Sequence, residues 1–264
     1  MSKRLRQLGL TLPHQHIAPY GKRNVFIASV TILAIAASVI AILFYNGVIL
    51  FNNPSLKEYP VRGVDVSSYQ GEIDWDVLAR QGIQFAFIKA TEGSSFVDPY
   101  FADNYAHAQN TTLRISAYHF FSFDSSGNTQ ADHFISVVPK AESMLPPIID
   151  IEFYGNKEKN LPNKESTQRE LSVLLAKLEE QYGMKPILYA TEKSYALYIA
   201  NAFDEYDIWI RNTVTTPTLS DGRAWTFWQY TSRETLDGYR GAERFIDMNV
   251  FRGTKEAFDA YPNK

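Results

Sequence analysis

Two acidic residues, Asp150 and Glu152, end an otherwise apolar segment, LPPIIDIEF, at residues 145–153. Side chains two positions apart on a strand point to the same face, so both carboxyl groups face the core or a cleft that opens from it. Burial side by side raises the pKa of at least one of them. Glycoside hydrolysis uses such a pair, with one protonated group as the general acid. An Asp-x-Glu pair is also common as a loop entry or helix cap, so alone it is a weak signal.

The segments around these acids alternate between strand-like and helix-like sequence. The pattern predicts strands at 61–69, 85–91, 113–121, 145–153, 186–191, 207–213, 224–231 and 245–251. It predicts helices at 73–82, 98–110, 128–138, 166–182 and 193–202. In the clearest helix, at 166–182, Thr167 and Glu170 fit a capping box.

This alternation predicts an α/β fold, because each strand followed by a helix favours parallel strands with right-handed crossovers. Eight strands favour a TIM-like (β/α) barrel, and little helix separates the last three strands. The expected architecture is therefore roughly (β/α)5(β)3, with an irregular last third. A doubly wound open sheet is the structural alternative. No GxGxxG motif, and no GxxxxGK motif ending in Ser or Thr, follows a strand in the sequence, so the usual nucleotide-binding signals of that fold are missing.

Two further acids fall in predicted strands. Asp65 closes the apolar run of the first strand, and Asp247 lies in the last strand. Catalytic groups of such barrels sit at the C-terminal ends of the strands. These two acids therefore join Asp150 and Glu152 as candidates.

Four groups of motifs occur in a characteristic order: RGVDVSSYQGEIDW (62–75), FAFIKATEG (85–93), ISAYHFF with PPIIDIE (115–121 and 146–152), and WQYT followed by IDMNVF (228–231 and 246–251). In this order and spacing they resemble glycoside hydrolase family 25, the lysozymes that act as N-acetylmuramidases. The similarity spans about residues 61–255. It implies a peptidoglycan hydrolase that cleaves the bond between N-acetylmuramic acid and N-acetylglucosamine.

The resemblance also implies roles for individual residues. Glu152 matches the general acid, and Asp150 matches its partner, which either stabilises an oxazolinium formed by the substrate's acetamido group or acts more directly. Asp65 and Asp247 match the two other acids of the cleft. Aromatic residues fall where the family lines its sugar groove, namely Tyr118, Tyr189, Trp228 and Tyr230. Arg211 departs from the family, whose members often carry a small residue there, and this puts substrate detail in doubt.

An apolar run without charge extends from residue 25 to 45, with more apolar sequence up to 51. At 1.5 Å per residue it is long enough to cross the roughly 30 Å hydrocarbon core of a membrane. The five basic residues among residues 1–51 all precede the run, and no acid does, so the positive-inside rule keeps the N-terminus in the cytoplasm. A cleaved signal peptide is the alternative, because Ala34-Ile35-Ala36 has the spacing of a processing site.

We therefore expect four parts along the chain. These are a basic cytoplasmic N-terminus (1–24), a transmembrane signal-anchor helix (25–51), a linker (52–60) and an extracytoplasmic barrel domain (61–264). A hydrolase held by a short linker reaches only glycan near its own membrane.

Composition argues against several function classes. The net charge is −3 and no basic cluster follows the apolar run, which disfavours nucleic acid as a partner. The chain has no cysteine, and the histidines beyond residue 51 form no ligand-spaced cluster, so no metal or other cofactor is expected. The expected partners are peptidoglycan glycan strands and the membrane, and the expected state is a monomer.

Two other functions compete with the muramidase. Chitinase-like hydrolases use Asp-x-Asp-x-Glu, but Ile148 stands at the first of those positions. A wall-binding module that kept the fold and lost catalysis is the second alternative. The presence of all four acids argues against it.

Overall fold

The computed structural model describes residues 21–141 and 144–262, and the chain divides into two compact units between Asn46 and Gly47. The first unit contains helix α1 (Lys22–Tyr45), of 24 residues, which is apolar on all sides and has no buried residue. At 1.5 Å per residue it is about 36 Å long, and its length and apolar composition suit a membrane span or a signal sequence. The helix ends at Tyr45, short of residue 51, and Gly47 follows with a φ of 71°.

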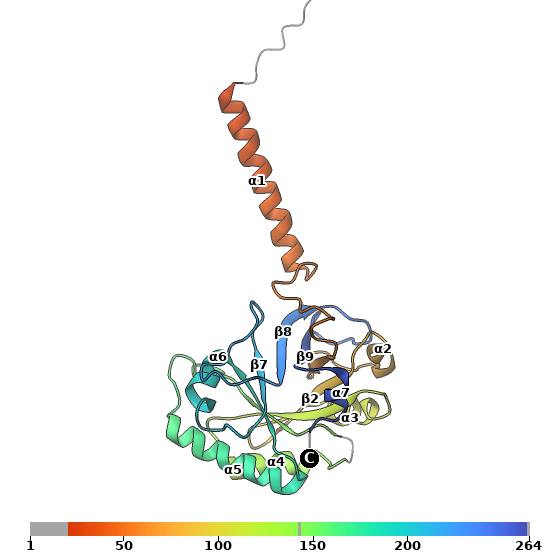
Figure 1. Cartoon of the computed structure of the whole chain (residues 1–264), viewed down its shortest axis with the longest axis vertical. Helices are drawn as coiled ribbons and strands as arrows, with labels where there is room; N and C mark the ends of the chain where they lie inside the picture. The colour runs from red at the N-terminus through yellow and green to blue at the C-terminus, as the bar shows by residue number, and fades with distance from the viewer. Residues whose placement is uncertain (1–20, 142–143, 263–264) are drawn as a thin grey trace, which may run out of the picture. The chain divides into compact units, whose positions relative to one another are not determined.

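Eight strands close into a barrel within the described part of the second unit (Figure 1). They are β1 (Arg62–Val66), β2 (Phe85–Glu92), β4 (Arg114–Phe120), β5 (Ile148–Ile151), β6 (Ile187–Thr191), β7 (Ile208–Arg211), β8 (Phe227–Glu234) and β9 (Ile246–Phe251). Pairing of β1 with both β2 and β9 closes the ring. A two-residue strand, β3 (Phe96–Val97), pairs with β2. The predicted barrel is confirmed.

Helices follow the first five barrel strands, as expected. They are α2 (Trp75–Ala79), α3 (Phe101–Ala108), α4 (Gly127–Val137), α5 (Lys164–Tyr182), and α6 (Glu192–Ser194) continued by the π-helix η2 (Tyr195–Ile199). Helices α4 and α5 lie side by side on the outside of the barrel (Figure 1). A short helix that was not predicted, α7 (Lys255–Asp259), follows β9.

Helix α5 begins two residues before its predicted start, so the predicted capping box is wrong. Asn163 is the N-cap, and its side chain accepts a hydrogen bond from the Ser166 backbone N–H at 2.9 Å. Thr167 is buried inside the helix, and the Glu170 carboxylate accepts from the backbone N–H of Gly127 at 2.8 Å. Glu170 therefore ties α5 to the first residue of α4.

The irregular last third takes a specific form, because β9 runs antiparallel to both of its neighbours, β8 and β1. The described residues between β8 and β9 form no helix, so the chain returns as a hairpin rather than as a crossover. Asp247, near the start of β9, consequently lies directly opposite Asp65, near the end of β1. A residue from the beginning of one strand thus reaches the same barrel mouth as residues from the ends of the others.

Strand alternation divides the apolar residues into an inner and an outer core. Phe85 and Phe87 of β2 pack inside the barrel, whereas Ala86 and Ile88 pack outward against the helices. The ring of Phe85 fills the space beside Gly63, where a Cβ atom would lie 2.3 Å from the ring. The floor of the barrel is therefore packed with aromatic rings, and its mouth is left for polar groups.

Candidate active site

The four predicted acids meet at one end of the barrel. Asp150 lies in β5 opposite Tyr189 of β6, whose ring belongs to the inner core. Glu152 comes two residues later, so alternation points it to the same inner face. Asp65 and Asp247 form a directly opposed pair across β1 and β9. The sequence prediction that these acids share one mouth agrees with their positions.

Asp65 is held by a network of buried amides. Its Oδ2 atom accepts hydrogen bonds from Gln229 Nε2 at 2.9 Å and from Asn249 Nδ2 at 2.7 Å. Asn249 in turn accepts from the indole N–H of Trp209 at 2.7 Å, and Gln229 accepts from the Tyr189 hydroxyl at 2.9 Å. Every member of this chain has a fixed partner, which orients the Asp65 carboxyl group within the mouth.

The environment of Asp65 and Asp247 favours their protonated forms. Burial raises the pKa of Asp65 to about 6, against a smaller opposing effect of its hydrogen bonds from Asn249 and Gln229. Burial and then the neighbouring charge of Asp65 raise the pKa of Asp247 well above its ordinary value. The pair therefore binds protons more tightly than carboxyl groups in water do.

The same causes act on Asp150 and Glu152. Burial and then the charge of Glu152 raise the pKa of Asp150 well above its ordinary value. Asp150 is only 6% exposed, and its Oδ1 atom has no hydrogen-bond partner among the described residues. Burial raises the pKa of the half-buried Glu152, and the charge of Arg211 opposes that rise. Both shifts favour the protonated forms, and Glu152 is the more accessible of the two.

Basic side chains lie near these acids. The Lys89 ammonium group forms an ion pair with Glu92 at 2.9 Å, and its charge lowers the pKa of Asp150 against the effect of burial. Arg211, at the end of β7, is exposed. Its charge lowers the pKa of Asp65 and Asp247 against the larger effect of burial, as it does for Glu152.

Two of the four predicted aromatic residues belong to the mouth. Tyr118 is half-buried and lines a cavity of about 280 Å³ together with Asp65, Asp247 and Tyr69. Tyr189 is 4% exposed and forms part of the amide network described above. A larger hollow of about 570 Å³ lies between α2, α3 and residues 238–240, but none of the four acids lines it.

Trp228 and Tyr230 do not join the acids, and their position does not fit the predicted contact with sugar. Both are buried in the outer core, where the ring of Trp228 lies 5.6 Å from that of Trp225. The Trp228 indole N–H donates to the backbone oxygen of Asn212 at 2.8 Å. The physical reason is alternation, because Gln229 faces inward and its two neighbours therefore face outward.

Sequence reasoning missed three polar or aromatic members of the site, Trp209, Gln229 and Asn249. Asn249 lies two residues after Asp247 on the same strand, so alternation from a known acid was an available signal. Gln229 lies within the WQYT motif, between Trp228 and Tyr230, which were predicted to line the sugar groove in its place. Trp209 gave no polar signal, because its role depends on a partner distant in sequence.

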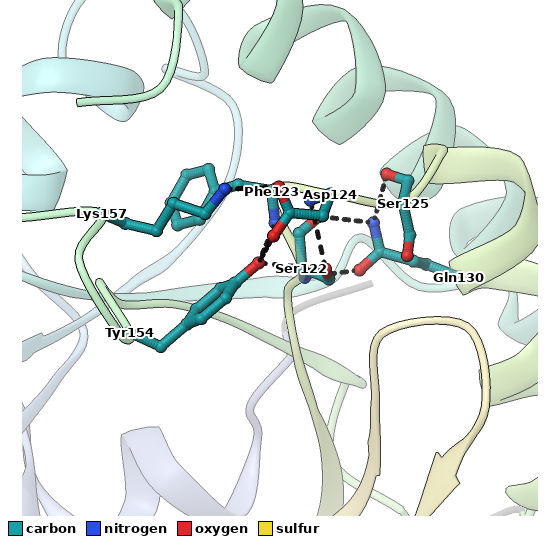
Figure 2. A network of polar contacts seen from close by, with 7 residues as sticks. All are labelled: Ser122, Phe123, Asp124, Ser125, Gln130, Tyr154 and Lys157. Carbon is teal, nitrogen blue, oxygen red and sulfur yellow. Dashed lines mark hydrogen bonds and ion pairs between the residues drawn. The ribbon is translucent and has the colours of Figure 1, made fainter. Parts of the chain in front are cut away.

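A second polar network fixes the loop that follows β4, at the rim of the barrel (Figure 2). The Tyr154 hydroxyl accepts from the backbone N–H of Phe123 at 3.1 Å and donates to Asp124 at 2.9 Å. Lys157 forms an ion pair with Asp124. The Gln130 side chain donates to the backbone oxygens of Ser122 and Ser125, both at 3.0 Å. The loop is therefore tied both to α4 and to the segment that follows β5.

His119 contacts Gln130 of α4 and does not line the cavity beside Asp65 and Asp247. It is fully buried, with one ring nitrogen 2.7 Å from Thr91 Oγ1 and the other 3.0 Å from Gln130 Oε1. Burial lowers the pKa of His119 to about 4. Among residues 21–141 and 144–262, no group of three or more His, Asp or Glu side chains is arranged to hold a metal ion.

Comparison with known proteins gives a consistent result. The family model described as glycosyl hydrolases family 25 matches residues 64–239. A solved structure of a family 25 glycosyl hydrolase from Bacillus anthracis is 56% identical, with a TM-score of 0.75 over 79% of this chain and 96% of that chain. The uncharacterized protein YegX of Escherichia coli is 38% identical over 77% of this chain and 74% of its own length. Lysozyme M1 of Streptomyces globisporus is 30% identical over 77% of this chain and 71% of its own length.

Proposed function

The chain belongs to glycosyl hydrolase family 25 and is a glycoside hydrolase, and we propose that it is a 1,4-β-N-acetylmuramidase. Its substrate would be peptidoglycan, cut between N-acetylmuramic acid and N-acetylglucosamine. The observation that carries this proposal is the placement of Asp150 and Glu152 on one inner face, where burial raises the pKa of both. The similarity to lysozyme M1 supports the choice of substrate.

Glu152 is the proton donor in this proposal. It is half-buried, so a glycosidic oxygen can reach it, and burial raises its pKa, which favours the protonated form that a general acid needs. Asp150 is deeper and has one carboxyl oxygen without a hydrogen-bond partner. That oxygen either stabilises an oxazolinium formed by the substrate's acetamido group or attacks the anomeric carbon itself. NMR of the first-formed anomer tests for net retention, which both routes require.

The remaining residues shape the cleft. Asp65 and Asp247 present polar groups to the substrate next to the scissile bond, and the amides of Gln229 and Asn249 keep Asp65 in place. Tyr118 offers an aromatic face to the apolar C–H surface of a sugar ring, and the buried Tyr189 supports the amide network below it. The reaction needs no metal or cofactor in this proposal.

We further propose that α1 anchors the enzyme in its membrane, with the N-terminus in the cytoplasm and a monomeric catalytic domain outside. The length and hydropathy of α1 support this arrangement. Fractionation of cells that express the chain with or without residues 25–51 tests it. Recovery of the full-length form as a shortened soluble protein would favour a cleaved signal sequence.

The catalytic proposal is tested with the purified chain and peptidoglycan. We expect release of reducing ends that carry muramic acid, and loss of this activity in Glu152→Gln with binding to the wall retained. If the wild type binds the wall but releases no reducing ends, the chain is a wall-binding module instead. Reducing ends that carry glucosamine would indicate cleavage of the other glycosidic bond.

A further inference from the structure

We infer that Arg211 is a specificity-determining residue that binds a carboxylate of the glycan substrate at the barrel mouth. This inference rests on the proposed function. The other described polar groups of the site are mostly acids and amides. Arg211 adds a positively charged group that recognises the anionic part of the substrate.

The position of Arg211 follows from the sheet. It is the last residue of β7 and lies directly opposite Thr191 of β6 and Gln229 of β8. Directly opposed residues point to the same face, and Gln229 points inward to Asp65. Trp209, two positions before Arg211, belongs to the inner core. Arg211 therefore rises from the inner face at the mouth, where its side chain is exposed.

The charge of Arg211 is available for a ligand. It forms no ion pair within 4 Å with any described residue. Lys89 differs, because Glu92 holds its ammonium group at 2.9 Å and the ring of Phe120 lies 5.0 Å away. Arg211 nevertheless lies close enough to Glu152 to oppose the rise of its pKa. A group bound by Arg211 would therefore lie at the same mouth as the proposed proton donor.

The chemistry of peptidoglycan supplies the matching group. Each muramoyl unit carries a lactyl carboxylate, which is either free or joined to a peptide stem that has carboxylates of its own. Any of the four acids that is ionised disfavours an anionic ligand in the cleft. A guanidinium group offsets this repulsion, and it matches a carboxylate with two parallel hydrogen bonds.

The test measures binding separately from catalysis. In the full chain carrying Glu152→Gln, the dissociation constant is measured with and without Arg211→Gln. The ligands are peptide-free strands, peptide-bearing strands, and both kinds after conversion of their carboxylates to amides. We expect Arg211→Gln to weaken binding of the untreated strands by about 10-fold, because a charge-assisted hydrogen bond is lost. Binding of the amidated strands should change by less than about 2-fold, because no charge is paired there.

Two further variants control for fold and for charge. Arg169, exposed on α5, is the matched control, and Arg169→Gln should leave binding of every ligand unchanged. Arg211→Lys keeps the charge and should restore part of the binding, because an ammonium group lacks the planar two-bond geometry. If Arg211→Gln weakens binding of peptide-free strands only, the group bound by Arg211 is the lactyl carboxylate. If it weakens binding of peptide-bearing strands only, the bound group is a carboxylate of the peptide stem.

An equal loss on amidated and untreated strands, or no loss on either, would overturn the inference. Kinetics of the enzyme that retains Glu152 give a second check, where Arg211→Gln should raise KM and leave kcat within about 2-fold. A fall in kcat with a shifted pH profile and an unchanged KM would mean that Arg211 acts only through the acids. Failure of the proposed function appears separately, as a wild type that releases no reducing ends while the binding comparison still gives its result.

Discussion

Asp150 lies near the C-terminal end of β5, and Asp124 lies in the loop that follows the neighbouring strand β4. The surroundings of these two aspartates shift their pKa values in opposite directions. Burial and the charge of Glu152 raise the pKa of Asp150. Hydrogen bonds from Lys157 and Tyr154 lower the pKa of the exposed Asp124. The two aspartates are chemically identical, so the difference comes from position inside or outside the barrel mouth.

The barrel separates the groups proposed for catalysis from the groups that hold its loops. The acid cluster of the mouth, made of Asp65, Asp150, Glu152 and Asp247, places several carboxyl groups where ionisation is costly. The rim network around Tyr154 (Figure 2) places one carboxylate where a lysine and a hydroxyl stabilise its charge. The first region holds protons that a reaction can use, and the second holds a loop in place.

The largest expected contrast is in catalysis. Glu152→Gln should lower kcat on peptidoglycan by on the order of 10²-fold or more, because it removes the proton donor. Asp124→Asn, in the rim network, should change kcat by less than about 2-fold, because Asp124 contributes only to loop structure. Release of reducing ends by the two purified variants measures both values. Equal losses in the two would remove the functional distinction between the regions.

The second contrast is in the pH dependence of stability. Asp65 has a pKa of about 6 when folded against 3.8 ordinarily, so the folded state binds its proton more tightly than the unfolded state does. Ionisation of Asp65 therefore does not lower the free energy of unfolding below about pH 4. Above pH 6 it lowers the free energy of unfolding by its full amount, about 3 kcal/mol. We expect Asp65→Asn to be more stable than the wild type at pH 7.5 and to lose that advantage at pH 4.

Urea denaturation of Asp65→Asn and the wild type at both pH values checks this. Asp124→Asn should change stability in the opposite direction and be less stable than the wild type at pH 7.5. The lowered pKa of Asp124 contributes stability above its unfolded pKa, and this stability is lost as the pH falls. If Asp65→Asn were destabilised equally at both pH values, burial would not be what raises the pKa of Asp65.

A smaller effect is expected at Tyr154. Tyr154→Phe removes the hydroxyl that contacts Ser122, Phe123 and Asp124, and it should lower the free energy of unfolding by about 1 kcal/mol. The exchange of the Phe123 backbone amide with solvent should become faster. Unchanged exchange would show that the loop is held mainly by Gln130.

The smallest effect belongs to Lys157. Its ion pair with Asp124 is at the surface, and such pairs contribute little because water and salt screen them. Lys157→Gln should lower the urea midpoint only slightly and leave kcat unchanged within error. A clear loss of activity would mean that the rim network contributes to catalysis, contrary to the distinction made above.

Much of the fold was predictable because its signals are local. Hydrophobic alternation and helix periodicity gave the order of strands and helices, and the motifs around Asp65 and Asp150 indicated their shared mouth. The direction of β9 was harder, because it depends on the connection after β8, which is too short for a helical crossover.

The aromatic part of the site was less predictable. Tyr118 and Tyr189 face the mouth, but Trp228 and Tyr230 face outward. A shift of one residue along a strand turns every side chain to the other face of the sheet. Every residue of WQYT is aromatic or polar, so the sequence alone did not show which of them point into the barrel. The amide network was missed because Gln229 and Asn249 act by donating hydrogen bonds to Asp65, which is distant in sequence.

Burial in the barrel mouth raises the pKa of Glu152 and so favours the protonated form of the proposed proton donor. Carbon-13 NMR of side-chain carboxyl groups, assigned with Glu152→Gln and Asp124→Asn, tests it most directly. We predict that Glu152 titrates above its ordinary value of 4.5 and that Asp124 titrates below its ordinary value of 3.8. A Glu152 midpoint at or below 4.5 would contradict the claim.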